Sequence, residues 1–380
     1  MSTPKVLFVS HASSISGAEM VLLDVAPAFP GSAAFIFERG ALSNELARRD
    51  MPVIVATFGS GLSGIKRESR LTRAAPLAGK MAAIVAELSM AARKFDVIYA
   101  NSQKAFVLGS LAAALSRRPL IWHLHDIINK AHFGDGQRRL QISLANRFAR
   151  LVIAPSTAVQ STFIAEGGRA ELVRIIPNGI DCAVDPSSKA VLRPRLGLPS
   201  GPLIGVFSRI AAWKGQHVML RAMANLPNVH CIIVGSALFG EERYEKSLRT
   251  LCRTLGLERR VTFLGQRSDV PLLMQAMDAV VHPSVDPEPF GRTLVEAMLV
   301  GTPIVATDTG AAREILKEDA TLVKPGDSVA LATALRTVLS DAGKRADDLA
   351  NTSKRASATY GVKIMQTKIA EEVSAAAQIN

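Results

Sequence analysis

The stretch Ala279-Val-Val-His282, followed closely by Asp286-Pro-Glu-Pro-Phe-Gly-Arg-Thr-Leu-Val-Glu296, contains a strand, a loop and the start of a helix. The short run 279–282 is mostly apolar and β-branched, which predicts a buried strand, and the helix is expected to run to about Leu299. Buried strands that alternate with helices are typical of a parallel α/β sheet. Because ligands bind beyond the carboxyl ends of the strands in such sheets, this loop predicts a binding site.

The same alternation runs through the chain on both sides of this stretch. Buried strands are predicted at residues 6–9, 34–37, 53–56, 97–99, 120–122 and 151–153, and again at 203–207, 231–234, 261–264, 279–282 and 303–306. Between the two series the rhythm lapses after Ile176-Pro-Asn-Gly-Ile-Asp181 into a polar stretch with prolines. The sequence therefore predicts an α/β protein with two doubly wound Rossmann-like domains, residues 1–182 and 183–360, that face each other across a cleft. A C-terminal helix over residues 361–380 can pack back on the N-terminal domain.

The chain has 380 residues and a formal net charge of +12, which favours an anionic partner such as a nucleotide, an anionic lipid or a nucleic acid. Its 3 cysteines show no C-x-x-C spacing, so neither a disulfide framework nor a zinc knuckle is expected. The longest uncharged run, residues 222–240, contains Asn, Pro and His and does not predict a membrane span. No signal peptide is expected either, and these features favour the cytoplasm.

Positive charge is concentrated in the first part of the chain, where residues 1–180 hold 21 Lys and Arg against 12 Asp and Glu. Within it, residues 62–94 alternate basic and apolar side chains. A basic amphipathic segment can lie on an anionic membrane surface. The same pattern also fits an ordinary surface helix with a solvated polar face, and both interpretations stay open.

Two carboxylates lie in the stretch 286–296, Glu288 in the loop and Glu296 in the helix that follows. An ionised carboxylate can accept hydrogen bonds from two vicinal hydroxyls at once, so a sugar or a ribose is a suitable ligand. Phe290 and Gly291 can offer backbone N–H groups beside Glu288. In the alternative interpretation, Glu296 only caps or decorates its helix and Glu288 is solvated.

A second polar loop, Phe207-Ser-Arg-Ile-Ala-Ala-Trp-Lys-Gly215, follows the first strand of the second domain. Arg209 and Lys214 can both reach a ligand there and bind a diphosphate, Arg through paired hydrogen bonds and Lys as a compact charge. The alternative is a pair of solvated cations.

The first strand of the chain is followed by Ser16-Gly-Ala-Glu19, which opens a helix at about Glu19. Glycine there lets the amides of a helix N-terminus approach an anion closely. The motif is neither G-x-G-x-x-G nor a P-loop, so it identifies no nucleotide fold by itself.

Histidines gather in Trp122-His-Leu-His-Asp126, where strand alternation places His123 and His125 on the same side. A metal site needs further ligands at a suitable spacing, and no zinc-enzyme signature is present, so no metal is predicted. As an alternative to a functional role, these histidines can be structural, with hydrogen bonds to neighbouring groups. For His282 the sequence offers no partner.

Taken together, these motifs resemble those of retaining glycosyltransferases of the GT-B fold, of the family 4 type that includes bacterial mannosyl- and glucosyltransferases. The resemblance covers residues 5–361 and is strongest over residues 205–316. It depends on the spacing of Glu288 and Glu296 with Pro-Phe-Gly between them, and on the order of the other motifs, namely Asn178-Gly-Ile-Asp181, Arg209 and Lys214.

In the second domain, the resemblance implies that Arg209 and Lys214 bind the donor diphosphate. It implies that Glu296 holds the ribose and that the base lies near Gly265 and Gln266. The chain departs from the family at Gly310-Ala311, where two glycines are common.

For the sugar, the resemblance implies that Glu288 and the backbone of Phe290 and Gly291 hold the donor hydroxyls. In the first domain, His125 would lie at the donor sugar and Gly17 would approach the β-phosphate. Ser16 stands where the family usually has the first of two glycines.

The implied activity is metal-independent transfer of a hexose, with retention, from a GDP- or UDP-linked sugar to a lipid-linked or other saccharide acceptor in cell-envelope or exopolysaccharide synthesis. No cofactor is expected. Fixed cations would stabilise the charge of the leaving diphosphate, which would help to deprotonate the acceptor. Such an acceptor favours a peripheral position on the inner face of the cell membrane, with the anionic surface as a partner.

Other functions remain as alternatives. A sugar-nucleotide epimerase of the same fold would convert the donor without an acceptor. A basic protein without enzymatic activity could bind nucleic acid or membrane, but only 5% of residues are aromatic and no nucleic-acid module is recognised. A dinucleotide-dependent dehydrogenase would need a glycine-rich fingerprint that is absent.

Overall fold

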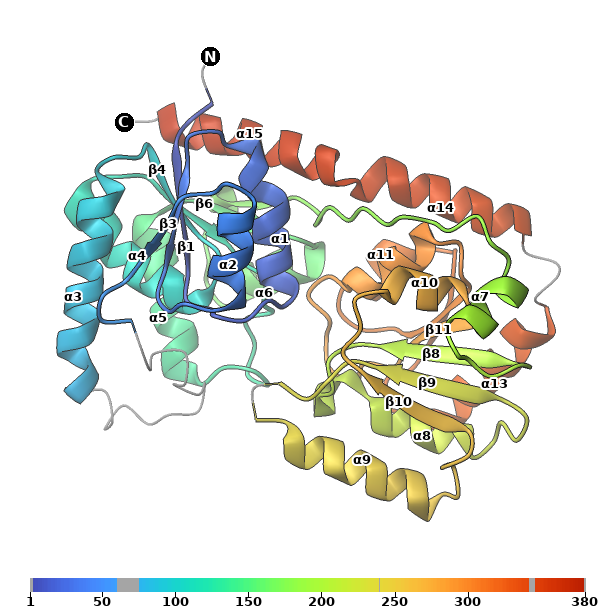
Figure 1. Ribbon diagram of the computed structural model, residues 1–380. Helices are drawn as coiled ribbons and strands as arrows, with labels where there is room; N and C mark the ends of the chain where they lie inside the picture. Colours follow the sequence, from blue (N-terminus) through green and yellow to red (C-terminus); the bar gives the residue numbers. More distant parts are fainter. Residues whose placement is uncertain (1–2, 60–74, 239, 342–345, 379–380) are drawn as a thin grey trace. The chain divides into compact units, whose positions relative to one another are not determined.

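The computed structural model describes residues 3–59, 75–238, 240–341 and 346–378, and the chain forms two compact units (Figure 1). Unit 1 comprises residues 1–179 and 362–380, and unit 2 comprises residues 180–361. The divisions thus lie after Gly179 and Gly361, where the sequence predicts them after residues 182 and 360. The shift has a local cause, because the Ile180 N–H donates to the Tyr360 carbonyl at 2.7 Å and so already belongs to unit 2.

Unit 1 is built on a seven-stranded parallel sheet in the order β3-β2-β1-β4-β5-β6-β7. Its strands are β1 Val6–Ser10, β2 Ala33–Ile36, β3 Val53–Val55, β4 Val97–Ala100, β5 Leu120–His123, β6 Ala149–Ala154 and β7 Val173–Ile175. Its helices are α1 Gly17–Val25, α2 Ala41–Arg48, α3 Ala75–Ala92, α4 Gln103–Ser116, α5 Asp135–Phe148, α6 Thr157–Ala165 and α15 Val362–Gln378, with short 3-10 turns at Ala26–Ala28 and Ala170–Leu172. The order reverses between β1 and β4.

Unit 2 repeats this plan with six parallel strands in the order β10-β9-β8-β11-β12-β13. Its strands are β8 Leu203–Phe207, β9 His230–Val234, β10 Val261–Gly265, β11 Ala279–His282, β12 Ile304–Thr307 and β13 Thr321–Val323. Its helices are α7 Lys189–Arg195, α8 Gln216–Met223, α9 Glu242–Thr254, α10 Val270–Gln275, α11 Arg292–Leu299, α12 Ala312–Leu316, α13 Ser328–Ser340 and α14 Ala346–Tyr360, with a 3-10 turn, η4, at Ala212–Lys214. The order reverses between β8 and β11.

The central strands are buried on both faces, which explains why they appear in the sequence as continuous apolar runs. Every residue of β1 and of β8 is buried. The apolar pattern did not predict β7 and β13. Each has three residues, lies at an edge of its sheet and is only partly buried, so neither produces an apolar run long enough to recognise.

Helix α15 closes unit 1 although it follows unit 2 in the chain. It packs on α1 and β6, and Ile369 and Val373 are fully buried in the same apolar cluster as Leu22 of α1. The Gln366 side-chain amide donates to the Asp24 carbonyl at 2.6 Å. Figure 1 shows α15 beside α1 in unit 1.

The basic segment of residues 62–94 is described only in part. Lys66, Arg67, Arg70 and Arg73 lie outside the described residues. The remainder is mostly α3, which buries Ile84 and exposes Lys80, as an amphipathic surface helix does. Of the helices that the structure describes, none combines the length and the apolar character needed to cross a membrane.

The packing of α15 predicts that Ile369→Ala destabilises unit 1 selectively, by about 2–5 kcal/mol, because it leaves a cavity in the core. The chain has 2 tryptophans, Trp122 in unit 1 and Trp213 in unit 2. In a Trp213→Phe background, denaturant unfolding followed by Trp122 fluorescence should show a lower midpoint. Val329→Ala, at a side chain that is 64% exposed in unit 2, is the control and should leave this midpoint unchanged. Equal midpoints for Ile369→Ala and its parent would contradict the role of α15.

Candidate active site

The loops after β8 and β11 leave the sheet of unit 2 where its strand order reverses, which is where ligands bind in open α/β sheets. Gly215 brings the two loops together. Its φ is +71°, and a Cβ added there would lie 1.9 Å from the Pro283 carbonyl oxygen, so no other residue fits without a shift of the backbone. The Val285 N–H also donates to the Trp213 carbonyl at 2.8 Å. This contact positions Lys214 against the loop that carries Glu288.

Lys214 and Glu288 form a buried ion pair between these two loops. The Lys214 ammonium donates to Oε2 of Glu288, and the side chains are 12% and 10% exposed. The alternative interpretations of the two motifs require Lys214 and Glu288 to be solvated, and neither residue is. Burying two charges costs free energy unless their geometry is good and other groups assist.

The electrostatics of Glu288 follow from this pairing. Burial by itself would raise the pKa of the carboxyl, but Lys214 foremost and His282 next outweigh it and lower the pKa to about 2. His282, at the end of β11, places Nε2 3.4 Å from the same Oε2. Glu288 is therefore ionised at neutral pH and can accept hydrogen bonds from hydroxyl groups.

The backbone of Glu288 is held by the loop after β12. Gly310 has φ +59°, and a Cβ there would lie 2.2 Å from the Glu288 carbonyl oxygen and 2.3 Å from its nitrogen. The next N–H, of Ala311, donates to that carbonyl at 2.9 Å. One glycine is therefore required at this point, and the following alanine contributes through its backbone.

Arg209 and Lys214 share Trp213 as a neighbour. The guanidinium carbon of Arg209 lies 5.5 Å from the centre of the indole ring, and the Lys214 ammonium lies 4.1 Å from it. Buried Gln216 holds the Arg209 loop, because its amide donates to the Arg209 carbonyl at 2.9 Å and to Ser208 Oγ at 3.0 Å. The two predicted phosphate ligands thus lie in one cationic, aromatic corner.

The other predicted residues lie just before α11 or within it, and their environments differ. Phe290 buries its ring against Tyr360, 5.9 Å away, so only its backbone can serve a ligand. Gly291 is the N-cap of α11. Glu296 is 15% exposed, with Arg292 Nε at 3.9 Å, and burial raises the pKa of its carboxyl more than Arg292 lowers it.

The residues predicted to contact the base lie at the end of β10. The Gly265 carbonyl accepts from the Gly235 N–H at 2.7 Å, which ties the ends of β10 and β9 together. Gln266 is the first residue after β10, and its side chain is exposed. Both lie at the carboxyl edge of the sheet, on the β9 side of β8.

In unit 1, Gly17 is the first residue of α1 and is exposed, so the helix begins two residues earlier than the sequence predicts. The helix is capped by Ser16 and Glu19, whose Oε2 accepts from the Ser16 N–H at 3.0 Å. Glu19 is 4% exposed, and burial raises the pKa of its carboxyl.

Strand β5 ends at His123, so His125 lies in the loop, but the two rings are on the same side with centres 4.0 Å apart. His125 Nε2 lies 3.0 Å from Asn101 Oδ1, and His123 Nδ1 lies 2.7 Å from the Tyr99 hydroxyl. Burial, with a smaller effect of His125, lowers the pKa of His123 well below its usual value. Over the described ranges, no three His, Cys, Asp or Glu side chains gather in a group that could hold a metal ion.

Sequence reasoning did not consider Asn101, found no partner for His282, and named Gly310 only as part of a departure from the family pattern. His282 ends a buried strand and Asn101 follows one, and ligands bind at such positions in parallel sheets, so this position could have identified both residues. No sequence pattern indicates why Gly310 must be a glycine, because the reason is its close approach to the Glu288 backbone in space.

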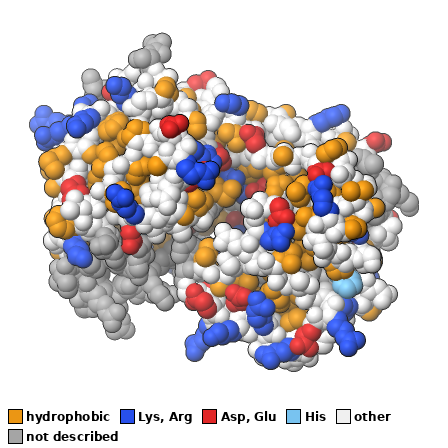
Figure 2. All heavy atoms as spheres, in the orientation of Figure 1, with side chains coloured by type: hydrophobic (Ala, Val, Ile, Leu, Met, Phe, Trp, Pro, Cys, Tyr) orange, Lys and Arg blue, Asp and Glu red, His pale blue; other side chains and the backbone are white. Residues whose placement is uncertain are grey.

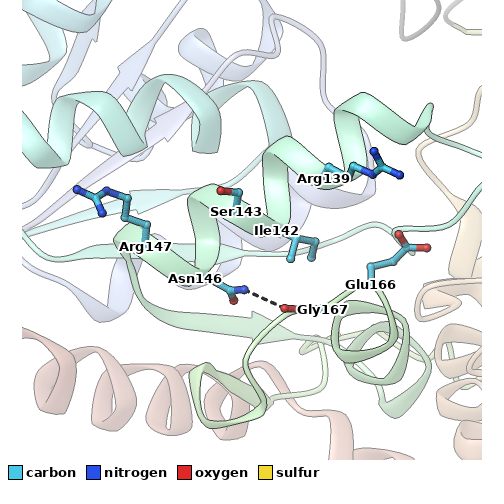
Figure 3. A pocket seen from close by; sticks show the side chains of 7 residues that line it. All are labelled: Arg139, Ile142, Ser143, Asn146, Arg147, Glu166 and Gly167. Carbon is cyan, nitrogen blue, oxygen red and sulfur yellow. Dashed lines mark hydrogen bonds between the residues drawn. The ribbon is translucent and has the colours of Figure 1, made fainter.

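An open hollow of about 680 Å3 lies on unit 1, between α5 and the turn after α6 (Figure 3). The Asn146 amide donates to the Gly167 carbonyl there at 2.8 Å. None of the predicted site residues lines this hollow, so it does not belong to the candidate site.

Comparisons with known proteins identify the family and the fold. Residues 189–356 match the family of glycosyl transferases group 1, and residues 40–184 match glycosyltransferase family 4. The Anabaena protein Alr3699/HepE, solved in complex with UDP-glucose, is 41% identical and has a TM-score of 0.88, over 98% of this chain and all of that one. The same protein has been solved with UDP and glucose, at a TM-score of 0.87. The chain belongs to the glycosyltransferases, and its two units have the architecture of the GT-B fold.

Curated relatives are more distant. D-inositol 3-phosphate glycosyltransferase of Xylanimonas cellulosilytica is 28% identical over 289 residues, which are 70% of this chain and 69% of that protein. The lipopolysaccharide core biosynthesis mannosyltransferase LpsB of Rhizobium meliloti is 31% identical over 211 residues, half of this chain and 60% of that protein.

The lowered pKa of Glu288 makes the stability of unit 2 depend on pH. The ionised carboxylate stabilises the folded state above the ordinary pKa of 4.5, and this contribution, about 3 kcal/mol, is lost as the pH falls towards 2. In a Trp122→Phe background, where Trp213 reports on unit 2, the free energy of unfolding should fall more steeply between pH 5 and 2.5 than in Glu288→Gln. The change Glu242→Gln, at an exposed residue of α9, is the control and should keep the parent slope. A Glu288→Gln slope equal to that of the parent would contradict the ion pair.

Proposed function

We propose that the chain transfers a hexose from a nucleoside diphosphate sugar, UDP- or GDP-linked, to a saccharide acceptor. The observation that carries the proposal is the buried Lys214–Glu288 pair beside Arg209 at the strand reversal of unit 2. It combines cations for a diphosphate with a carboxylate for sugar hydroxyls, and Alr3699/HepE, the relative solved with UDP-glucose, supports such a donor.

In the proposed reaction, the bond between the anomeric carbon and the diphosphate breaks and negative charge develops on the leaving phosphate. Lys214 and Arg209 stabilise this charge, and Trp213 shields the Lys214 ammonium from water on one side. Glu288, with the backbone of Phe290 and Gly291, orients the sugar. We further propose that the acceptor oxygen bonds to the anomeric carbon from the face that the phosphate leaves, which retains the configuration, and that the leaving phosphate takes the acceptor proton, so that no metal is required.

Lys214 gains a second anionic partner when the donor binds. In the described state its ammonium is paired with Glu288, and a diphosphate brings a stronger anion to the same place. Both anions can share the cation, because an ammonium has three donors. The roles of Glu296 at the ribose, of Gly265 and Gln266 at the base, and of Gly17 and His125 in unit 1 stay predictions from the resemblance.

We propose a lipid-linked or other envelope saccharide as the acceptor, used at the inner face of the cell membrane. Support comes from the excess of basic residues in residues 1–180 and from the name of LpsB. On the face drawn in Figure 2, Lys and Arg side chains are interspersed with acidic and apolar ones, so the support for a membrane surface comes from the charge count and not from this face.

A thermal-shift panel of UDP, GDP, ADP and CMP with their common sugar conjugates, with and without magnesium, tests the donor site. One nucleoside diphosphate should stabilise the protein selectively, by about 2.7 kcal/mol at 100 times its dissociation constant, whether or not magnesium is present. Lys214→Ala should lose the shift with the nucleotide alone. Glu288→Ala should keep that shift and lose the further shift with the sugar conjugate, while the exposed control Lys246→Ala should keep both. If no nucleotide shifts the protein, even with anionic liposomes present, the proposal is wrong.

Flotation with anionic liposomes tests the membrane interaction. Neutralising Lys66, Arg67, Arg70 and Arg73 should reduce the bound fraction, since each basic residue near an anionic surface contributes about 1 kcal/mol. A control removes the same charge from exposed residues of α9, namely Arg243, Lys246, Arg249 and Arg253. Equal binding by the two variants would show that the segment has no special role.

A further inference from the structure

His282, the last residue of β11, adjoins the Lys214–Glu288 pair at Oε2 of Glu288. Its side chain is 4% exposed, and its Nε2 is 3.4 Å from Oε2 of Glu288, the oxygen that also pairs with Lys214. A single carboxylate oxygen is thus shared by an ammonium and an imidazole. Oε1 is held by neither group, so it can meet a sugar hydroxyl.

Hydroxyl groups fix the imidazole from both sides. Thr293 Oγ1, on the first turn of α11, lies 3.3 Å from Nδ1, and Ser284 Oγ lies 3.1 Å from Nε2. Thr307 steadies this corner, because its hydroxyl donates to the Ser284 carbonyl at 2.6 Å. With Thr293 donating to Nδ1, the ring proton is on Nε2, whose neighbouring acceptors are Ser284 Oγ at 3.1 Å and Glu288 Oε2 at 3.4 Å.

This arrangement matters when a donor arrives, since the diphosphate takes part of the Lys214 charge. A buried carboxylate that loses its partner is strongly disfavoured, and it would turn towards the cation or towards water. An imidazole N–H 3.4 Å from Oε2 would still offer this oxygen a donor after part of the Lys214 charge has gone to the phosphate.

We propose that His282 is a positioning residue that keeps the Glu288 carboxylate in place while Lys214 binds the donor diphosphate. The inference rests on the proposed function, because it requires a diphosphate at Lys214 and a sugar at Glu288. Its consequence is specific to the sugar: losing His282 disturbs the contact with the hexose and leaves the contact with the diphosphate intact.

The test compares the affinities for UDP and UDP-glucose, measured by calorimetry on the full chain. His282→Ala should weaken UDP-glucose binding about tenfold and change UDP binding by less than about twofold, as expected when a hydrogen bond to a charged group is lost. His282→Gln, which can place an amide donor near the position of Nε2, should recover most of the loss. Thr293→Val, which removes the bond to Nδ1, should show a smaller loss of the same kind.

A matched control is His230→Gln at the beginning of β9, at the opposite end of the sheet, which should bind both ligands like the parent. Two results would overturn the inference: unchanged UDP-glucose binding by His282→Ala, or an equal loss for UDP and UDP-glucose that glutamine does not repair, which indicates a merely structural histidine. If the parent chain prefers another nucleotide of the thermal-shift panel, the same comparison is made with that nucleotide and its sugar conjugate. Failure of the parent chain to bind any of them would remove the proposed function together with this inference, and that pattern differs from both.

Discussion

Two opposite charges withdrawn from water, on Lys214 and Glu288, set the constraint that the rest of unit 2 satisfies. Each ion costs several kcal/mol to bury, and their attraction compensates only if the two groups are held in register. Two loops and the end of a strand hold the pair in place. The loop after β8 is pressed against Pro283 at Gly215, the loop after β12 supports the Glu288 backbone through Gly310, and the end of β11 supplies the imidazole of His282. The charges therefore explain why backbones approach so closely here.

The two units share a topology and differ in chemistry at the place where the strand order reverses. In unit 2 this place holds a buried ion pair. In unit 1 the contacts at this edge include His11 with Ser102, His125 with Asn101 and the Asp126 carboxylate with the Gln103 amide, and none of these three is an ion pair. A shared fold thus provides a position for a site, and the side chains decide its chemistry.

Much of the fold follows from the sequence, because a strand buried on both faces needs a continuous apolar run. That relation identified the central strands and failed for β7 and β13, which are short edges with mixed burial. The sequence also identified Glu288 and Lys214 as candidates through their loops. It did not reveal that they pair, nor that His282 adjoins them, because these contacts join loops whose separation in space no local spacing fixes.

Gly310 illustrates the same limit in another way. In the sequence, a single glycine followed by alanine is a departure from the family pattern. In the structure, the contribution of Ala311 is an N–H group, which alanine provides as well as glycine does. The requirement for glycine is set by the neighbouring chain at Glu288, so the sequence difference has no visible effect on this contact.

Helix α15 also bears on how the protein is made. Unit 2 is complete in the chain by Gly361, whereas unit 1 still lacks the helix that buries Leu22 and its neighbours. On a ribosome the later unit can therefore close first, and the unit that begins the chain must wait with part of its apolar surface uncovered. This reverses the usual order, in which the N-terminal domain folds first during synthesis.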